Sequence, residues 1–251
     1  MGRKVDVAIH IRGIVDLKPV VGALNLVWLI SHPDKLLSAD VQMADALFVP
    51  SDIARDAIQR RFGIDSQVMP QATDPRRFAF QEQISIPALA ERLLFIGNSR
   101  RQPRRIVMDS VELRLPVDIY GGDWQFYVGK EVVRGTYVRN DDLAGYYRSA
   151  RCVLNDHWAT MASHGIVSNR LFDVTAAGGI AISDEVAGID DLFRGHVRTY
   201  RTREDLAALV ATLPDWIPSV EARRDLSRAI LEQHSFDARA RQFIDFIHAF
   251  G

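Results

Sequence analysis

Short apolar runs alternate with amphipathic stretches along the chain. In the first third, four runs are rich in strand-forming residues: VDVAIHI, LNLVWLI, ALFVP and QVMP. A second series contains RLLFIGNS, PVDIYG, CVLND and GIAISD. Strands that alternate with helical segments are typical of parallel sheets with crossover helices. The pattern therefore predicts two α/β regions in succession.

Several helical segments carry recognisable start and stop signals. Residues 52–62 have apolar residues at helical spacing, with Ser51 placed to cap the start and Gly63 to end the helix. The predicted apolar side consists of Ile53, Ala57, Ile58 and Phe62. A Thr-x-x-Asp capping pattern opens TREDLAALVATL. Residues 221–233 and 236–250 are predicted to form two further helices.

The two series of strands suggest a division into domains. Residues 1–80 are predicted to form a partial Rossmann-like domain, because this series has hardly any helix before Leu26 and looks like the back half of a nucleotide-type domain. Residues 88–235 are predicted to form a complete second domain. The stretch 79–91 has no clear period and is interpreted as the linker. A last helix over 236–251 is a candidate to pack back on the first domain.

Composition narrows the classes of partner. The net charge of −1 gives no overall field that favours nucleic acid or an anionic membrane, and neither is expected as a partner. Of the 31 cationic side chains only four are lysines, so 27 are arginines. The planar guanidinium suits phosphates and carboxylates, although genome base composition would give the same bias.

Cysteine usage and hydropathy bear on location. Cys152 is the single cysteine, so no internal disulfide forms, and its apolar surroundings predict a buried side chain. The N-terminal stretch lacks the apolar core of a signal peptide. No apolar run approaches the ~20 residues that span a bilayer. The sequence predicts a cytoplasmic protein without a transmembrane segment.

The segment FIGNSRRQPRR is the first candidate site, because ligands of open parallel sheets gather outside the carboxyl ends of strands. Gly97 allows a ligand to approach the backbone. Asn98 and Ser99 offer hydrogen bonds, and Arg100 and Arg104 offer positive charge, so the loop is expected to hold a diphosphate. It lacks the spacing of a dinucleotide site and the lysine of a P-loop. The alternative is a solvated basic turn.

The segment SHGIVSNRLFDVTAAGG is the second candidate site. Ser168 can cap a helix on which Asn169, Arg170 and Asp173 share one face, with the glycines at 178–179 ending it. The start of the helix favours a phosphate, and an aspartate one turn further in can accept hydrogen bonds from ribose hydroxyls. The alternative is a surface ion pair between the arginine and the aspartate, worth ~0.3 kcal/mol.

Two histidines follow predicted strands, His32 in LISHPD and His157 in LNDHW. Both are candidate site residues, although a structural role is the default for any single histidine. Pro33 is expected to hold His32 in an extended conformation. No two histidines have metal-ligand spacing with a cysteine or carboxylate on one helix, so no metal is expected. Trp124, in YGGDW, is expected either to cover a ligand or to pack its loop.

Together these stretches resemble the C-terminal domain of group 1 glycosyltransferases of the CgeB-like, spore-maturation type. The resemblance rests on LLFIGNSRRQPRR, VDIYGGDW, GTYVRNDDLAGYYRSARCVLNDHW and GIVSNRLFDVTAAGGIAISD, and covers residues 93 to about 245. LNLVWLISHPD and QATDPRRF resemble the later part of the acceptor domain. The resemblance implies an α/β, GT-B-like fold, with two Rossmann-type parallel-sheet domains that face a cleft and the first one truncated.

The resemblance also implies roles for single residues. The Gly97 loop with Arg100 and Arg104 would hold the donor diphosphate. Asp173 matches the second acid of the family's Glu-x7-Glu pattern, which binds ribose. At the start of the same helix, Asn169 and Arg170 would lie beside the phosphates or the sugar. The expected catalytic residue is His32, which matches the acceptor-side histidine. The remaining expected donor-binding residues are Asn98, Ser99, His157 and Ser168.

Two features depart from the family pattern. The first acid of Glu-x7-Glu would fall at Gly165, with His164 beside it, so the sugar-contacting carboxylate is absent. A retaining mechanism is therefore not carried over. The first half of the acceptor domain is also missing, and a partner chain or a further N-terminal segment would complete it.

The sequence thus predicts a hexosyltransferase-type enzyme that needs no metal and no cofactor apart from its nucleotide-sugar substrate. It would move a sugar from the nucleotide sugar to a hydroxyl of a polysaccharide, a lipid-linked glycan or a protein. The alternatives are a non-catalytic module that binds nucleotide sugars and a GT-B sugar-nucleotide epimerase.

Overall fold

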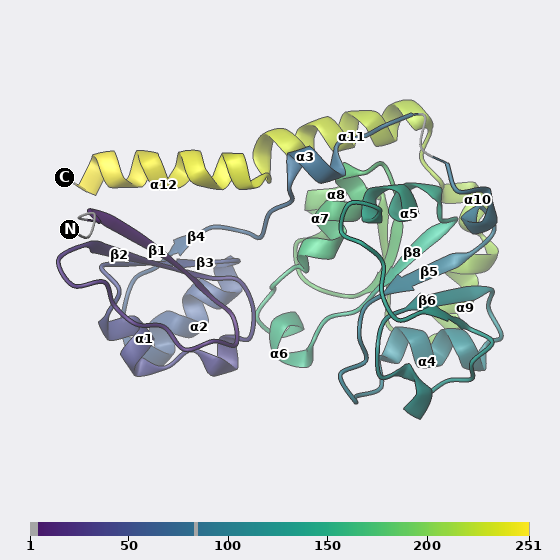
Figure 1. The fold of residues 1–251 in the computed structure, drawn as a ribbon, viewed down its shortest axis with the longest axis horizontal. Coiled ribbons are helices and arrows are strands. Elements are labelled where there is room, and N and C mark those ends of the chain that lie inside the picture. The colour runs from purple at the N-terminus through teal and green to yellow at the C-terminus, as the bar shows by residue number, and fades with distance from the viewer. Residues whose placement is uncertain (1–4, 83–84, 251) are drawn as a thin grey trace. The chain divides into compact units, whose positions relative to one another are not determined.

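The computed structural model describes residues 5–82 and 85–250, which form two compact α/β units (Figure 1). Unit 1 comprises the residues up to Gln71 together with His157–Ser168 and Val186–Gly188. Unit 2 comprises Ala72–Asp156, Asn169–Glu185 and the residues from Ile189 onward. The chain therefore passes from one unit to the other more than once.

Unit 1 is built on a parallel sheet. Its elements are β1 (Val7–Arg12), β2 (Leu24–Leu29), η1 (Pro33–Lys35), α1 (Ser38–Gln42), β3 (Ala46–Val49), α2 (Asp52–Phe62), β4 (Gln67–Val68) and α6 (Ala159–Ala162). The strands pair in the order β1-β2-β3-β4, so this sheet grows in one direction without a reversal. Val27 and Leu29 of β2 face the core that Ala54 and Ile58 of α2 cover.

Helix α2 matches its prediction in both bounds and in both caps. The side chain of Ser51 accepts a hydrogen bond from the backbone N–H of Ala54 at 3.0 Å, and Gly63 adopts the left-handed conformation with φ 71°. The predicted apolar side is wrong at Ile53, which is 42% exposed, because the core side of the helix is centred on Ala54 and Ile58.

Unit 2 holds a larger parallel sheet with helices on both faces (Figure 1). Its elements are α3 (Pro75–Phe78), η2 (Pro87–Leu89), β5 (Leu93–Ile96), α4 (Arg105–Glu112), β6 (Val117–Tyr120), η3 (Trp124–Phe126), β7 (Val133–Gly135), α5 (Leu143–Ser149), β8 (Cys152–Asn155), α7 (Asn169–Ala176), β9 (Ala181–Asp184), α8 (Ile189–Phe193), β10 (Val197–Tyr200), α9 (Arg203–Ala211), α10 (Leu213–Trp216), α11 (Val220–Gln233) and α12 (Phe236–Phe250). Strands β7 and β10 are not among the predicted strands. Helices α11 and α12 match their predictions.

The sheet of unit 2 has the strand order β10-β9-β8-β5-β6-β7. From β5 the chain moves outward to β6 and β7, and then returns to place β8 on the other side of β5. This is the doubly wound order of nucleotide-binding folds, with its reversal between β5 and β8. It confirms the predicted α/β class with parallel sheets.

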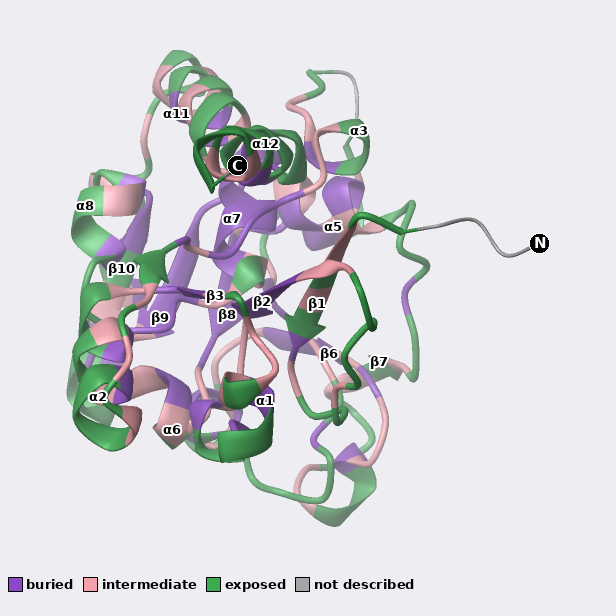
Figure 2. Cartoon of the chain, turned by 90° about the vertical axis from the view of Figure 1, so that its left-hand side faces the viewer, coloured by how far each residue is buried: buried purple, intermediate pink, exposed green. Residues whose placement is uncertain are grey.

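The core of unit 2 lies on both faces of this sheet. One face packs on α4 and α9 through buried apolar residues that include Phe95, Ile119 and Leu154. On the other face, α7 is buried from Leu171 to its end, as Figure 2 shows by its purple colour. Cys152 is fully buried, as predicted.

The boundary between the units lies earlier than the linker expected over 79–91. The division falls after Gln71, because the following residues pack on unit 2. Phe78 is buried and stacks on Tyr147 with ring centroids 6.1 Å apart, and the backbone N–H of Ile86 donates to Ser149 Oγ at 2.8 Å. The expected linker thus lacks a regular hydrophobic period because its backbone is irregular, although contacts such as that of Ile86 hold it on unit 2. Residues 83 and 84 of the expected linker lie outside the described residues.

The C-terminal helix α12 groups with unit 2, and its expected packing on the first domain stays a prediction. Residue 251, the last residue of the expected helix, lies outside the part of the chain that the structure describes.

Candidate functional site

The reversal point of the unit 2 sheet is the expected position of a ligand site. Ligands of such sheets bind in the crevice outside the carboxyl ends of the strands, where the strand order reverses. Here β5 ends at Ile96 and is followed by Gly97, while β8 ends at Asn155 and is followed by Asp156.

The loop after β5 is held in shape by the loop after β6. The backbone N–H of Gly97 donates to the carbonyl of Tyr120 at 2.8 Å, and that of Ser99 donates to the carbonyl of Gly122 at 3.0 Å. In return, the N–H of Gly122 donates to Oδ1 of Asn98 at 2.7 Å. These bonds fix the backbone of the predicted diphosphate loop without using the side chains of its arginines.

Trp124 supports this loop through its side chain. The side chain is 1% exposed, its Nε1–H donates to the carbonyl of Gly97 at 2.8 Å, and its ring meets the ring of Phe95 edge-on at 5.5 Å. Of the two roles expected for Trp124, the structure supports packing of the loop.

The polar residues of the loop differ in what they do. Ser99 is buried, and its hydroxyl donates to the carbonyl of Asp123 and accepts from the N–H of Arg101, both at 3.1 Å. It therefore stabilises the turn. Arg100 has a left-handed backbone with φ 55° and an exposed side chain, to which the described residues offer no hydrogen bond or ion pair.

Arg104 lies in a buried ion pair. Its Nη2 donates to the carbonyl oxygen of Asp156 at 2.8 Å and also to Oδ1 of the same residue, and the two side chains are 10% and 7% exposed. Burial raises the pKa of Asp156, and the Arg104 guanidinium opposes that rise. Arg104 thus compensates a buried carboxylate, and its expected contact with a diphosphate stays a prediction.

Arg170 reaches from α7 to the ends of both central strands. Its Nη1 donates to Oδ1 of Asn155 at 3.0 Å, and its guanidinium carbon lies 5.2 Å from the ring centre of Phe95. A Cβ atom at Gly97 would lie 2.9 Å from Nη2 of Arg170. The missing side chain at position 97 therefore makes room for the guanidinium at the reversal point.

Asn155, which is not among the expected site residues, is itself oriented by a chain of hydrogen bonds. Its Nδ2 donates to Oγ of Ser183 at 2.9 Å, and that hydroxyl donates to Oδ1 of Asp184 at 3.0 Å. Asn155 ends a strand at the reversal point, so its position in the sequence is a usable signal.

Asp173 lies one turn into α7 and is 8% exposed. Its Oδ1 accepts a hydrogen bond from Thr73 Oγ1 at 2.6 Å, and its Oδ2 accepts one from Nδ2 of Asn169 at 3.3 Å. Burial raises the pKa of Asp173 to about 7, against the opposing effects of the Thr73 bond and of Arg170. This burial argues against a solvated surface ion pair.

The helix end predicted at residues 178–179 is confirmed. Helix α7 ends at Ala176, and Gly178 follows with a left-handed φ of 82°. A Cβ atom at Gly179 would lie 2.5 Å from the carbonyl oxygen of Tyr147, so the close approach is to α5.

A family model described as glycosyl transferase-like matches residues 100–245, which is more than half of the chain and includes Asn155, Arg170 and Asp173. The chain belongs to this glycosyl transferase-like family. No curated protein matches the sequence.

Solved structures share the fold of this glycosyl transferase-like chain at low sequence identity. Sucrose-phosphate synthase from Thermosynechococcus elongatus aligns with a TM-score of 0.65 at 16% identity, over 91% of this chain and 68% of that one. The pneumococcal O-GlcNAc transferase, solved with UDP and GlcNAc, aligns with a TM-score of 0.59 at 14% identity, over 91% of this chain and 53% of that one. A glycosyltransferase from Rickettsia africae aligns with a TM-score of 0.57 at 11% identity, over 90% and 70%. These likenesses show the GT-B fold.

Two other expected donor-binding residues of this glycosyl transferase-like chain, His157 and Ser168, contact each other. The backbone N–H of Ser168 donates to Nε2 of His157 at 2.9 Å, so the imidazole carries its proton on Nδ1 when neutral. The two residues thus close the segment 157–168, which groups with unit 1. Their contacts with a donor stay predictions.

The chain makes a tight turn at Gly165, where the resemblance predicts that a carboxylate is absent. Gly165 has φ 62°, and a Cβ atom there would lie 3.2 Å from Cδ1 of Ile53 and from Oγ of Ser51. The Ser51 hydroxyl also donates to the carbonyl of His164, and this hydrogen bond fixes the turn. Backbone conformation and space therefore both disfavour a glutamate at residue 165.

His32 lies at the end of β2, half-buried, with Nδ1 3.0 Å from Oγ of Ser31. The expected extended backbone is wrong, because His32 is left-handed with φ 52° and ψ 59°. The ring of Pro33 disfavours the right-handed helical region, and histidine is among the residues that tolerate the left-handed one. The catalytic assignment stays a prediction.

Within residues 5–82 and 85–250, no group of three His, Cys, Asp or Glu side chains could hold a metal ion. No helix in the same ranges is long and apolar enough to cross a membrane.

Proposed function

We propose that this chain binds a nucleotide sugar at the reversal point between β5 and β8 and transfers its sugar to an acceptor hydroxyl without a metal ion. The observation that carries the proposal is the position of Arg170, whose guanidinium is bonded to Asn155 and occupies the space that Gly97 leaves open. Asp173 lies on the same helix, one turn further in. The chain spans between about half and 70% of the solved chains described above, so the activity of a whole enzyme is part of the proposal.

The diphosphate of the donor would meet fixed positive charge. Arg170 is already oriented by Asn155, and the exposed Arg100 extends from the loop after β5. The first turn of α7 adds the partial positive charge of a helix N-terminus. Arginines and backbone dipoles would stabilise the leaving diphosphate, which in other transferases is stabilised by a metal ion.

The ribose of the donor would bind to Asp173. Each oxygen of this carboxylate accepts one hydrogen bond in the structure, from Thr73 and from Asn169. An ionised carboxylate offers about four acceptor positions, so both ribose hydroxyls can still be accommodated. Because the pKa of Asp173 is raised to about 7, we expect nucleotide affinity to increase as the pH rises through that value.

The finer parts of the proposal rest on the sequence. The donor is a nucleoside diphosphate hexose, as favoured by the fold shared with an enzyme solved with UDP and GlcNAc. His32 orients the donor sugar or accepts the proton of the acceptor hydroxyl, and the chain is of the CgeB-like type. A partner chain or a further N-terminal segment completes unit 1, whose sheet has four strands in one direction.

The turn at Gly165 favours a second candidate, a module that binds nucleotide sugars without catalysis. The family's sugar-contacting carboxylate belongs at this position, and the left-handed backbone with φ 62° leaves no suitable place for it. Such a module would keep the donor site of unit 2 and lack turnover.

Calorimetry with UDP, GDP and ADP in the presence of EDTA tests the proposal, followed by assays of the corresponding nucleotide sugars. Arg170→Gln should weaken diphosphate binding at least tenfold, since charge-assisted hydrogen bonds are worth ~1.5–3 kcal/mol. Arg228→Gln is the matched control, because this arginine is 65% exposed on α11.

The outcomes of these assays separate the candidates. Hydrolysis of the donor or transfer of its sugar supports a transferase. Binding without turnover supports the module, and isomerisation of the donor supports an epimerase. If no nucleoside diphosphate binds, the proposed donor site is refuted. If binding requires Mg²⁺, the proposal that no metal ion is needed is refuted.

A further inference from the structure

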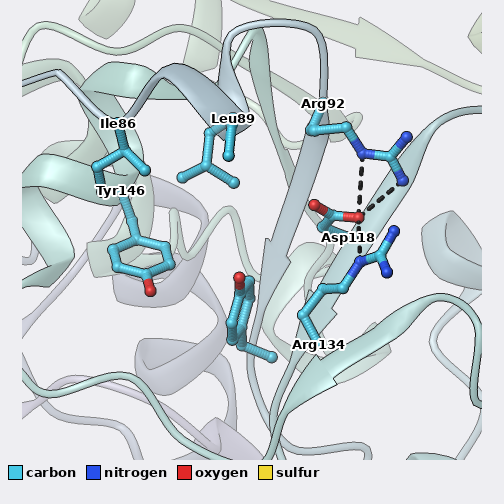
Figure 3. Close-up of a pocket in the computed structure, with 8 residues that line it drawn as sticks. Ile86, Leu89, Arg92, Asp118, Arg134 and Tyr146 are labelled. Carbon is cyan, nitrogen blue, oxygen red and sulfur yellow. Dashed lines mark hydrogen bonds and ion pairs between the residues drawn. The ribbon is translucent and has the colours of Figure 1, made fainter.

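Unit 2 contains a hollow of about 370 Å³ on the face of the sheet that α5 partly covers (Figure 3). The lining residues come from η2, β5, β6, β7 and α5 and from their ends: Ile86, Ala88, Leu89, Arg92, Asp118, Tyr120, Arg134 and Tyr146. Asp118 lies two residues before the end of β6, so this pocket extends below the carboxyl edge where the donor site is proposed. No role proposed above uses these side chains.

A carboxylate between two arginines forms the polar end of the pocket. Oδ1 of Asp118 accepts from Nε and Nη2 of Arg92 at 3.0 and 2.7 Å, and from Nε of Arg134 at 2.8 Å. The side chain of Asp118 is 8% exposed. Two guanidinium groups against one carboxylate leave this cluster with a net charge of +1.

Several donors of the two arginines remain available. Among the residues that the structure describes, neither Nη1 nor Nη2 of Arg134 has a hydrogen-bonding partner, and neither does Nη1 of Arg92. The two side chains are 45% and 28% exposed. In Figure 3 the terminal nitrogens of both arginines lie on the same side of Asp118, which is the side away from Tyr146, and a single acidic group placed there can meet both arginines.

The other end of the pocket is aromatic and apolar. The rings of Tyr120 and Tyr146 meet edge to face, with centroids 5.2 Å apart and planes at 86°. Ile86 and Leu89 complete this wall, as Figure 3 shows. Burial raises the pKa of Tyr120, and the neighbouring Tyr146 and Asp118 raise it further, so the hydroxyl stays protonated and can donate a hydrogen bond.

Stability alone does not account for a carboxylate at this place. Removing a charged pair from water is costly, and well-packed apolar residues of similar volume often stabilise a protein equally well. The neighbouring residues Val117 and Ile119 of β6 are fully buried and apolar on the opposite face. The charged cluster instead holds two guanidinium groups in one orientation, as a recognition site for an anion requires.

We propose that this pocket binds an anionic saccharide that extends over Asp118, with its carboxylate or phosphate on the terminal nitrogens of Arg92 and Arg134 and its pyranose ring against Tyr120 and Tyr146. The volume is sufficient for one sugar ring with its acidic group. Binding as such is independent of the donor site. The role of the ligand rests on the proposed function: it would be an acidic sugar residue of the acceptor glycan, held on the unit that also binds the donor.

The test uses the full chain and four probes: glucuronate, glucose 6-phosphate, glucose and inorganic phosphate. Titrations followed by NMR or calorimetry should show at least tenfold tighter binding of glucuronate, glucose 6-phosphate or both than of glucose and of phosphate alone. The preferred anion then distinguishes a uronate from a sugar phosphate. Equal binding of inorganic phosphate would mean a simple anion site, and no preference over glucose would mean no anion recognition. Either result overturns the proposal.

Variants locate the binding. Arg134→Gln should reduce the affinity for the acidic sugar at least tenfold, and Tyr146→Leu should reduce it while leaving phosphate binding unchanged. Arg134 is 45% exposed on an edge strand, so its substitution should preserve the fold, which an unchanged Tm verifies. Arg228→Gln is again the control. Unchanged affinity in both pocket variants would refute the assignment.

The two proposals fail separately. Nucleoside diphosphate affinity should be the same in Arg134→Gln and the unaltered chain. If no nucleotide binds but the acidic sugar does, the donor site is refuted and the pocket is retained. The opposite result retains the donor site alone.

Discussion

Oγ1 of Thr73 donates a hydrogen bond to Oδ1 of Asp173 across 2.6 Å, joining two residues that lie a hundred positions apart in the chain. The backbone of Thr73 is also bonded to the chain where α11 passes into α12, since its N–H donates to the carbonyl of His234 and its carbonyl accepts from the N–H of Phe236, both at 2.9 Å. The segment that enters unit 2 is thereby fixed to the carboxylate that we propose for ribose.

The first prediction concerns this carboxylate and pH. The pKa of Asp173 is about 7 in the folded chain and near its ordinary value of 3.8 when unfolded. Between these values the folded state binds the extra proton, so the free energy of unfolding should fall as pH rises from about 4 to about 7, by on the order of 1 kcal/mol per pH unit. Asp173→Asn should lack this component.

Urea unfolding of both proteins at several pH values measures the effect, and the difference between their free energies of unfolding isolates it. Parallel curves for the two proteins would show that Asp173 does not titrate in this range.

The second prediction concerns the space at Gly97. A Cβ atom there would lie 2.9 Å from Nη2 of Arg170, which is the far end of a flexible side chain. Gly97→Ala should therefore displace the guanidinium and weaken diphosphate binding. It should lower the Tm only slightly, since the other close contact of the new Cβ is Cε1 of Phe95 at 3.3 Å. Gly122→Ala is the control, because its nearest neighbour is 3.5 Å away. Equal affinities in the two variants would contradict the proposed role of Arg170.

The third prediction concerns Arg100, which is exposed and has no partner among the described residues. Arg100→Ala should reduce affinity for a nucleoside diphosphate and leave that for the nucleoside unchanged, because a charge-assisted bond to phosphate is worth ~1.5–3 kcal/mol. Calorimetry with both ligands measures this difference. Equal losses for the two ligands would exclude a phosphate contact.

The fourth prediction concerns His32. His32→Asn should lower turnover ~10²–10⁴-fold, as expected for loss of a catalytic proton acceptor, with nucleotide affinity unchanged. Asparagine is the suitable replacement, because it tolerates the left-handed backbone with φ 52°. Steady-state rates and calorimetry on the same sample separate the two effects. Full activity in this variant would return His32 to a structural role.

The fifth prediction concerns Gly165. Gly165→Ala should destabilise the chain by more than the ~1–2 kcal/mol of a left-handed alanine, because the new Cβ would also lie 3.2 Å from Ile53 and Ser51. Gly63→Ala is the matched control, with φ 71° and no neighbour within 4 Å. Thermal unfolding of both variants measures the difference. If both lose equally, the contact with α2 has no energetic effect.

Local signals in the sequence are sufficient for much of the fold. Helix α2 is predictable at both bounds because Ser51 and Gly63 act on the adjacent turns. The capping box of Thr202 and Asp205 at α9 is predictable for the same reason. His32 shows the limit of such rules. The following proline disfavours the right-handed helical conformation at His32, but it does not decide between the extended and the left-handed conformation.

The site depends on contacts that local patterns do not contain. Position 97 is recognisable as a strand end, but the approach of Arg170 to it depends on the order of the strands. The charge of Arg104 suggests a phosphate ligand, and the partner that buries it, Asp156, lies 52 residues further on. Thr73 carries no signal as a partner of Asp173, because it belongs to a different segment of unit 2.

The interleaved segments of the two units mean that neither is an independent module. Residues 157–168 leave unit 2 after β8, group with unit 1 and return at the start of α7. A cut of the chain after Gln71 would therefore separate residues 157–168 from the unit 1 residues that they contact, including Ser51. Chimeras that exchange one whole unit between relatives need three exchanged segments, and evolution faces the same constraint. An exchange of unit 1 in this chain would have to preserve a connection that begins and ends at the strand and helix of the proposed donor site.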